Sequence, residues 1–301
     1  MKALVFYNGS TGSIGQFLKS EALDHNVTAI ALRSRLENSD HLKDELEQHL
    51  NSMKDIPEII TLINLAAVVS VPFCEANSDH TYWINVKATS DSIRAFTETA
   101  SKFKKKSRVV YISTGHVYAP SKEGALIKED NKVAPRSVYA KSKLAAEESL
   151  RNLRKSCDFS LIIARVFGVI APNQPENYIL PGLITRLNTN AAQIPGLEYT
   201  RDYLDARDIC DALIKLAINK DIPSFEILNL CGSQPIRIRD LANKILRLQN
   251  RNVDLSTLPG RKDDIPWMVG SNAKCTAYLG SPIKKITTEK TIKDALVLLS
   301  S

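Results

Sequence analysis

The sequence predicts an α/β protein with a doubly wound parallel sheet and a smaller C-terminal lobe. Short apolar runs alternate with helical patterns through the first two thirds of the chain, which is the order a parallel sheet requires. A glycine-rich turn follows the first apolar run. After Phe167 the alternation loosens through Pro172, Pro175, Pro181 and Pro195, which indicates a second lobe.

Each element follows from its hydrophobic period. Continuous apolar runs predict strands at 3–7, 27–32, 59–67, 108–113 and 160–166. Amphipathic runs predict helices at 14–21, 39–49, 82–103 and 139–154, and helix and strand return between 206 and 230. We therefore expect one domain from 1–168 plus 202–232, and a second lobe from 169–201 plus 233–301.

Composition limits the classes of partner. The chain has 301 residues and a formal charge of +7, which suits a phosphate-bearing small molecule. Lysines and arginines are scattered, so we expect no nucleic-acid partner. Five cysteines without metal-ligand spacing predict reduced thiols and no metal site. The absence of a signal peptide or a run of membrane-spanning length predicts a cytoplasmic protein without a membrane span.

Three glycines at three-residue steps separate the first strand from its helix. A side chain in this turn would block the approach of a pyrophosphate, which the N–H groups at the helix start can hold. The turn therefore predicts a Rossmann dinucleotide site in the first domain, and a merely tight turn is the alternative. The residues expected to contact the dinucleotide here are Gly9, Thr11, Gly12, Ser13, Ile14 and Gly15.

The end of the second strand bears on the choice of dinucleotide. An NAD site usually offers a carboxylate to the ribose hydroxyls there, but this strand ends in Leu32-Arg33-Ser34-Arg35. Arg33 or Arg35 could bind a 2′-phosphate through charge-assisted hydrogen bonds. NADP(H) is therefore the preferred cofactor, with NAD(H) as the alternative if both arginines are merely solvated.

Three residues form a candidate catalytic group. Tyr139 and Lys143 are four residues apart, which puts them on one face of a helix. An ammonium near a phenol stabilises the phenolate and brings its proton within useful reach. Thr114 ends an apolar strand, where open α/β sheets bind ligands, and its hydroxyl could donate to a substrate oxygen. A threonine that only caps a turn is the alternative.

The glycine turn, the Ser113-Thr114…Val117-Tyr118 segment and the Tyr139…Lys143 pair, in this order, resemble the extended short-chain dehydrogenase/reductases, which are the epimerase/dehydratase family. The resemblance implies cofactor contacts from Tyr139 and Lys143. It also implies a homodimer built through the helix with Tyr139 and the helix before it. The other cofactor contacts implied are Leu65, Ala66, Ala67 and Val166. Asn85 is implied as an active-site partner, and it lies in a segment where Ala88 replaces the family's glycine.

The segment Arg201-Asp202-Tyr203 resembles the element that joins the sugar-nucleotide lobe to the dinucleotide domain in this family. The likeness extends to nucleotide-sugar 4-ketoreductases of the GDP-4-dehydro-6-deoxymannose reductase type, and it implies that Arg201 and Arg261 bind a nucleotide diphosphate. Ion pairs with Asp202, and with Asp263 or Asp264, are the alternative. The full set of substrate contacts implied is Val69, Thr114, Gly115, His116, Phe167, Gly168, Leu180, Arg201 and Arg261.

Of three departures from the family pattern, the first bears on the reaction, and the other two bear on the identity of the substrate rather than on the reaction class. Gly115 and His116 stand where 4,6-dehydratases carry an acidic pair, so we expect no dehydratase unless His116 transfers the proton. Gly168 stands where the family offers asparagine. Asp40 and Asp44 fall in a predicted helix rather than in an adenine-binding motif.

The predicted function is NADP(H)-dependent reduction of a 4-keto deoxysugar linked to a nucleoside diphosphate. An NAD-dependent nucleotide-sugar 4-epimerase, which would use the same residues, is the runner-up. A non-catalytic protein that senses a dinucleotide is the alternative of another class.

Overall fold

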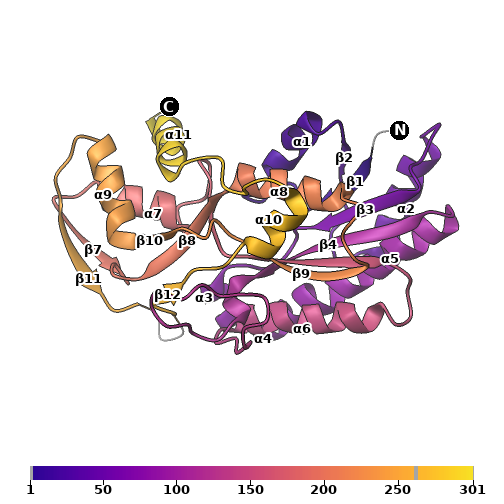
Figure 1. Cartoon of the computed structure of the whole chain (residues 1–301), viewed down its shortest axis with the longest axis horizontal. Coiled ribbons are helices and arrows are strands. Elements are labelled where there is room, and N and C mark those ends of the chain that lie inside the picture. The colour runs from indigo at the N-terminus through magenta and orange to yellow at the C-terminus, as the bar shows by residue number, and fades with distance from the viewer. Residues whose placement is uncertain (1–2, 261–263, 301) are drawn as a thin grey trace.

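The computed structural model describes residues 3–260 and 264–300 (Figure 1). Its central element is a six-stranded sheet in the order β2-β1-β3-β4-β5-β9, with every neighbouring pair parallel. The strands are β1 (Leu4–Asn8), β2 (Thr28–Ala31), β3 (Ile59–Asn64), β4 (Lys106–Thr114), β5 (Ser160–Val166) and β9 (Phe225–Leu230). The carboxyl ends of all six strands therefore lie along one edge of the sheet.

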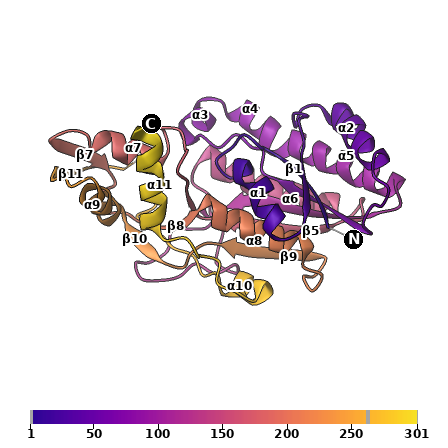
Figure 2. The ribbon, with the colours of Figure 1, turned by 90° about the horizontal axis from the view of Figure 1, so that it is seen from above.

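Helices cover both faces of this sheet, as Figures 1 and 2 show. On one face α1 (Gly15–Asp24) and α8 (Ala206–Ile218) pack against the strands through a shared apolar core. On the other face the core is shared with α2 (Ser39–Asn51), α5 (Thr89–Lys102) and α6 (Val138–Leu153). The predicted doubly wound parallel sheet is confirmed.

The segment before β4 differs from the single long helix predicted from Tyr82 to Phe103. Two short helices, α3 (Val71–Ala76) and α4 (Ser78–Tyr82), lead into a π-helical stretch, η1 (Trp83–Ala88), which continues into α5. A π-turn widens the helix by one residue and commonly occurs at functional sites. Asn85 lies inside this stretch and is fully buried.

The second group of elements lies to one side of the six-stranded sheet, at the left of Figure 1. Strand β8 (Thr200–Asp205) pairs with β6 (Gly168–Ile170), β10 (Pro235–Arg237) and β12 (Trp267–Met268), and β7 (Ala191–Pro195) pairs with β11 (Asp254–Leu258). Helices α7 (Ile179–Arg186), α9 (Ile238–Leu248) and α11 (Thr288–Ser300) accompany these strands, whereas α10 (Ala273–Leu279) packs beside β9 and α8. The exact lobe boundaries remain a prediction from the sequence.

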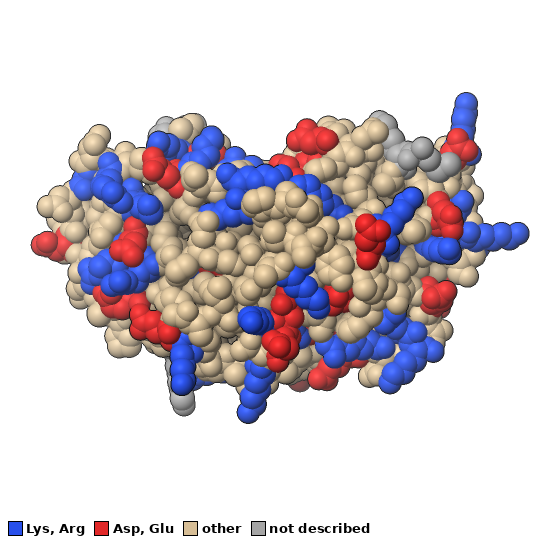
Figure 3. Space-filling view, in the orientation of Figure 1, with Lys and Arg blue, Asp and Glu red and all other residues tan. Residues whose placement is uncertain are grey.

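Basic and acidic side chains are interspersed over the face shown in Figure 3. The described residues include no helix that is both long enough and apolar enough to cross a bilayer.

A buried arginine ties β4 to the end of α8. Arg108 is 5% exposed, and its Nη1 donates to the carbonyl oxygens of Ala217 at 3.1 Å and Asn219 at 2.5 Å, with Leu216 at 3.4 Å. Carbonyls at a helix end have no partner within the helix. Arg108 therefore caps α8 from inside the sheet.

Replacing Arg108 by methionine leaves these carbonyls without their donor, and we expect the free energy of unfolding to fall by about 1–3 kcal/mol. Urea unfolding measures the change. The matched control is Lys106→Met on the same strand, whose pair with Glu58 is largely exposed, so its effect should stay below about 0.5 kcal/mol. Equal effects of the two variants would contradict the role given to Arg108.

Candidate active site

The glycine turn is fastened to the loop after β3 by one side chain. Asn8 Oδ1 accepts the N–H groups of Leu65 and Ala66, each at 2.8 Å, and Asn8 Nδ2 donates to Asn64 Oδ1 at 2.8 Å. A Cβ on Gly9 would lie 2.9 Å from the Ala66 nitrogen, and one on Gly15 only 2.1 Å from the Gly9 carbonyl oxygen. The turn therefore keeps its shape only with glycine at these positions.

This turn has the features that a dinucleotide needs. Thr11 and Gly12 are exposed at its tip, Ser13 and Ile14 are half-buried, and α1 begins at Gly15. Leu65, Ala66 and Ala67 lie beside the turn, immediately after β3. Exposed N–H groups at a helix start can hold a pyrophosphate, so the residues present fit the dinucleotide that the sequence predicts.

Thr114 and Tyr139 meet at the carboxyl edge of the sheet. Thr114 is the last residue of β4, and Tyr139 lies in the first turn of α6, which Ser137 caps by accepting the N–H of Ala140 at 3.2 Å. Burial raises the pKa of Tyr139 to about 12, so the phenol is protonated at neutral pH. The Thr114 hydroxyl lies near the phenol, where it opposes the rise in the pKa of Tyr139.

Lys143 lies one turn along α6 and is 3% exposed. Its Nζ is 4.2 Å from the centre of the Tyr111 ring. Burial lowers the pKa of the Lys143 ammonium to about 7, against the opposing effect of the Glu147 carboxylate. The sequence predicts that Lys143 depresses the pKa of Tyr139, but here the phenol pKa is raised because burial dominates and the ammonium faces Tyr111.

Asn85 joins three segments around these groups. Its side chain accepts the N–H of Val68 at 2.8 Å and donates to the Val68 carbonyl at 3.0 Å and to Ser142 Oγ at 3.0 Å. Ser142 lies between Tyr139 and Lys143 on α6. Asn85 therefore links the loop after β3 to the helix of the candidate catalytic pair, which is a positioning role.

A buried ion pair that the sequence did not predict lies beneath the site. Glu147 is fully buried and accepts from Arg165 Nε at 3.0 Å, from Arg165 Nη2 at 2.6 Å and from Ser113 Oγ at 2.5 Å. Arg165 also lies over the Tyr118 ring, at 4.8 Å. Two signals could have revealed this pair: a lone arginine in an apolar strand, and a glutamate four residues after Lys143.

Four of the predicted substrate residues differ in how accessible their side chains or backbones are. Val69 and His116 are partly accessible, and the His116 N–H donates to Thr114 Oγ1 at 3.2 Å. Gly115 packs on the Phe167 ring, where a Cβ would lie 2.9 Å from the ring, so no acidic side chain fits at this position. Leu180 is fully buried in the apolar core around α7.

Two further predicted residues are restricted by their neighbours. Gly168 lies against β8, where a Cβ would come within 2.6 Å of the Asp202 carbonyl oxygen. This contact explains the absence of the family's asparagine. Val166 ends β5 beside Thr114 and is 4% exposed.

Arg201 is paired within the protein. Its Nη2 lies 2.7 Å from Asp264 Oδ1, and Nη1 donates to the Thr200 carbonyl at 3.0 Å. This is the intramolecular ion pair that the sequence left open, with Asp264 rather than Asp202 as the partner. Arg261 lies outside the described residues.

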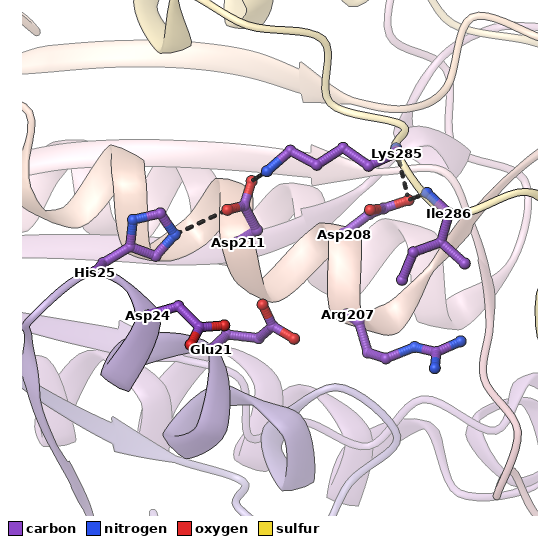
Figure 4. A pocket seen from close by; sticks show the side chains of 8 residues that line it. All are labelled: Glu21, Asp24, His25, Arg207, Asp208, Asp211, Lys285 and Ile286. Atoms are coloured by element: carbon purple, nitrogen blue, oxygen red, sulfur yellow. Dashed lines mark hydrogen bonds and ion pairs between the residues drawn. The ribbon is translucent and has the colours of Figure 1, made fainter.

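A polar pocket of about 320 Å³ lies apart from these groups (Figure 4). It is formed between the end of α1, the start of α8 and the 285–286 segment. His25 Nε2 and Lys285 Nζ each lie 2.8 Å from a carboxylate oxygen of Asp211 there. None of the predicted site residues lines this pocket, so it is not the candidate active site.

Comparison with known proteins identifies the class and then the family. A parallel sheet with a glycine turn, and a threonine, tyrosine and lysine at its carboxyl edge, define a nicotinamide-dinucleotide-dependent enzyme of the extended short-chain dehydrogenase/reductase type. The model of the NAD dependent epimerase/dehydratase family matches residues 6–231, so the chain belongs to that family. The predicted family and enzyme class are confirmed.

Individual relatives agree with this assignment. The chain is 27% identical over 272 residues to GDP-6-deoxy-D-mannose reductase from Pseudomonas aeruginosa, covering 87% of this chain and 85% of the relative. The structure of RMD from Pseudomonas aeruginosa complexed with NADPH has a TM-score of 0.83 at 23% identity, covering 98% of each chain. UDP-glucose 4-epimerase from Thermus thermophilus, in complex with NAD, gives 0.81 at 17% identity over 99% of each chain.

The buried ion pair gives a stability prediction. Replacing Glu147 by glutamine leaves the Arg165 charge buried without its partner, and we expect the free energy of unfolding to fall by about 3 kcal/mol in urea titrations. Glu148→Gln, on the exposed side of α6, is the matched control and should change it by less than about 0.5 kcal/mol. A loss no larger than that of the control would show that the pair does not hold α6 in place.

Lys143 gives a pH-dependent prediction for the ligand-free protein. Its pKa of about 7 lies below the ordinary value of 10.5, so above pH 7 the folded state binds fewer protons than the unfolded state. The cost of burying its charge is therefore greatest below pH 7 and shrinks by up to about 1.4 kcal/mol per pH unit as the pH rises above 7. Lys143→Met should be more stable than wild type below pH 7, with the difference shrinking towards pH 9.

Urea unfolding of both proteins between pH 6 and 9 measures this difference. Two parallel stability curves would contradict the buried position of the ammonium.

Proposed function

We propose that the protein is an NADP(H)-dependent reductase of a 4-keto deoxysugar linked to a nucleoside diphosphate. The observation that carries the proposal is the pair of hydroxyl groups from Thr114 and Tyr139 at the carboxyl edge of the sheet, on the side of the glycine turn. The similarity to GDP-6-deoxy-D-mannose reductase over most of both chains supports the substrate class.

A bound nicotinamide dinucleotide would supply the hydride. Thr114 donates a hydrogen bond to the keto oxygen and orients the carbonyl. Tyr139 gives its proton to that oxygen as negative charge develops there, a role that suits a phenol that is protonated at neutral pH. Lys143, one turn along α6 from Tyr139, binds the nicotinamide ribose.

The preference for NADP(H) rests on Arg33 and Arg35. Both side chains are exposed in the loop after β2, beside the glycine turn. A planar guanidinium binds phosphate oxygens through parallel charge-assisted bonds, which suits a 2′-phosphate.

Arg201 and Arg261 are proposed to bind the diphosphate of the substrate. Because Arg201 is paired with Asp264, substrate binding in this proposal exchanges the carboxylate for phosphate oxygens. A guanidinium can make this exchange without leaving its position over the Tyr199 ring, 5.4 Å away.

We also propose a homodimer built through α6 and the helical segment before it. The support is an exposed aromatic surface on that segment: Phe73 is 44%, Tyr82 37% and Trp83 47% exposed. Large apolar side chains grouped at a surface are typical of protein interfaces.

Tyr139→Phe removes the proton donor, and we expect the rate of NADPH oxidation by a GDP-4-keto-6-deoxysugar to fall by about 10²–10⁴-fold. NADPH affinity, measured by fluorescence titration, should stay within about twofold because the ring still fills its position. Tyr278→Phe on α10, away from the site, is the matched control and should keep full turnover.

Retained turnover in Tyr139→Phe would remove the assignment of the proton donor. Wild-type protein that converts a nucleotide sugar without consuming NADPH would instead be the 4-epimerase, which returns its hydride to the sugar.

A further inference from the structure

The loop after β2 is closed by a carboxylate from the following helix. Glu45 on α2 accepts the N–H of Arg33 at 2.8 Å through Oε1. Its Oε2 accepts the N–H of Ser34 at 3.0 Å and the Ser34 hydroxyl at 2.8 Å. The strand itself ends without an acidic residue, so the acid reaches this point from twelve residues further along the chain.

This loop is held against the segments proposed to bind the dinucleotide. The N–H of Leu32 donates to the Tyr7 carbonyl at 2.8 Å, which places the start of the loop beside the end of β1 and its glycine turn. Further along, Leu36 packs in an apolar cluster with Ala66, Val68, Ile84 and Ala88. Glu45 therefore fixes a negative charge at the β2 end of the proposed dinucleotide site.

The charge on Glu45 persists at neutral pH. Partial burial by itself would raise the pKa of this carboxyl, but the bonds from the Arg33 N–H and from the N–H and hydroxyl of Ser34 hold the pKa below its usual value. The exposed side chains of Arg33 and Arg35 belong to the same loop. The β2 end thus combines the fixed Glu45 carboxylate with the arginine cations of this loop.

The Glu45 carboxylate and the two arginines have opposite effects on the affinity for NADPH relative to NADH. At the end of β2 in Rossmann sites, a carboxylate favours the free ribose hydroxyls and an arginine favours a 2′-phosphate. Like charges brought together at a binding site lower affinity and exclude the wrong ligand.

We propose that Glu45 determines dinucleotide specificity: its carboxylate opposes the 2′-phosphate that Arg33 and Arg35 attract, so the protein uses both NADPH and NADH. This inference rests on the proposed function, because it concerns the same dinucleotide site. The specificity residue proposed here lies on α2 rather than at the end of β2. Loss of its negative charge should increase the preference for NADPH over NADH.

The test compares two ligands that differ only in the 2′-phosphate, adenosine 2′,5′-bisphosphate and AMP, by calorimetric titration of the full chain. Glu45→Gln removes the charge and keeps one of the two oxygens that accept from the loop, so it also loses the hydrogen bonds made to the other oxygen. We expect it to bind the bisphosphate about tenfold more tightly than wild type, with AMP affinity unchanged within about twofold. NADPH and NADH titrations followed by fluorescence should show the same change in their ratio.

The matched control is Asp44→Asn, which removes a negative charge from the adjacent, exposed position of α2. Its affinities for both ligands should stay within about twofold of wild type. Circular dichroism melts establish that each variant is folded. If Glu45→Gln does not fold, Glu45→Asp, which withdraws the charge by one methylene, should bind the bisphosphate more tightly than wild type does.

The outcomes separate this inference from the proposed function. Unchanged bisphosphate affinity in folded Glu45→Gln, or an equal gain in Asp44→Asn, would overturn the role of Glu45. Bisphosphate affinity that does not fall in Arg33→Ala or in Arg35→Ala would overturn the proposed preference for NADP(H) and leave the Glu45 result standing. Wild-type protein that binds neither dinucleotide would overturn the proposed cofactor site and the inference with it.

Discussion

The positions of the proposed catalytic groups depend on an ion pair that the protein buries completely. Glu147 on α6 receives two bonds from Arg165 on β5 and one from Ser113 on β4. Ser113 precedes Thr114, and Glu147 follows Lys143 by one helical turn. The desolvation of two charges is offset only when their geometry is close and their hydrogen bonds are satisfied, so the pair fixes α6 firmly against both strands.

That constraint explains how the site keeps a buried ammonium. Lys143 is out of water and packs on the Tyr111 ring, so its charge is costly in the ligand-free protein. The ion pair holds α6 against β4 and β5 one turn beyond Lys143, which opposes a shift of the helix that would bring the ammonium into solvent. A ligand whose hydroxyl groups bind the Lys143 nitrogen, as the ribose of a dinucleotide can, would offset this cost.

Much of this arrangement follows from local sequence signals. The alternation of strands and helices predicts the parallel sheet, and the sheet brings the glycine turn and Thr114 to one edge. The spacing of Tyr139 and Lys143 places them on one face of α6 because a helix repeats every 3.6 residues. Local signals do not predict the π-turn around Asn85, because the side chain of Asn85 bonds with Val68 and Ser142 from distant segments.

Long-range pairing accounts for the rest. Nothing near Arg201 in the sequence shows that Asp264 rather than Asp202 is its partner, because the choice depends on how β8 lies beside the segment that precedes β12. The carboxylate at the end of β2 was likewise hidden, because it comes from Glu45 on the next helix. Sequence motifs thus predict where the chemistry of the site lies, whereas its charge balance depends on contacts between separate elements.

The most direct measurement of the central claim is a crystal structure of the protein with NADP⁺ and GDP. We expect the pyrophosphate to lie on the turn from Gly9 to Gly15, with the nicotinamide ring beside the hydroxyl groups of Thr114 and Tyr139 and the ribose within reach of Lys143. A dinucleotide bound away from the glycine turn, or a nicotinamide ring that points away from Tyr139, would contradict this claim.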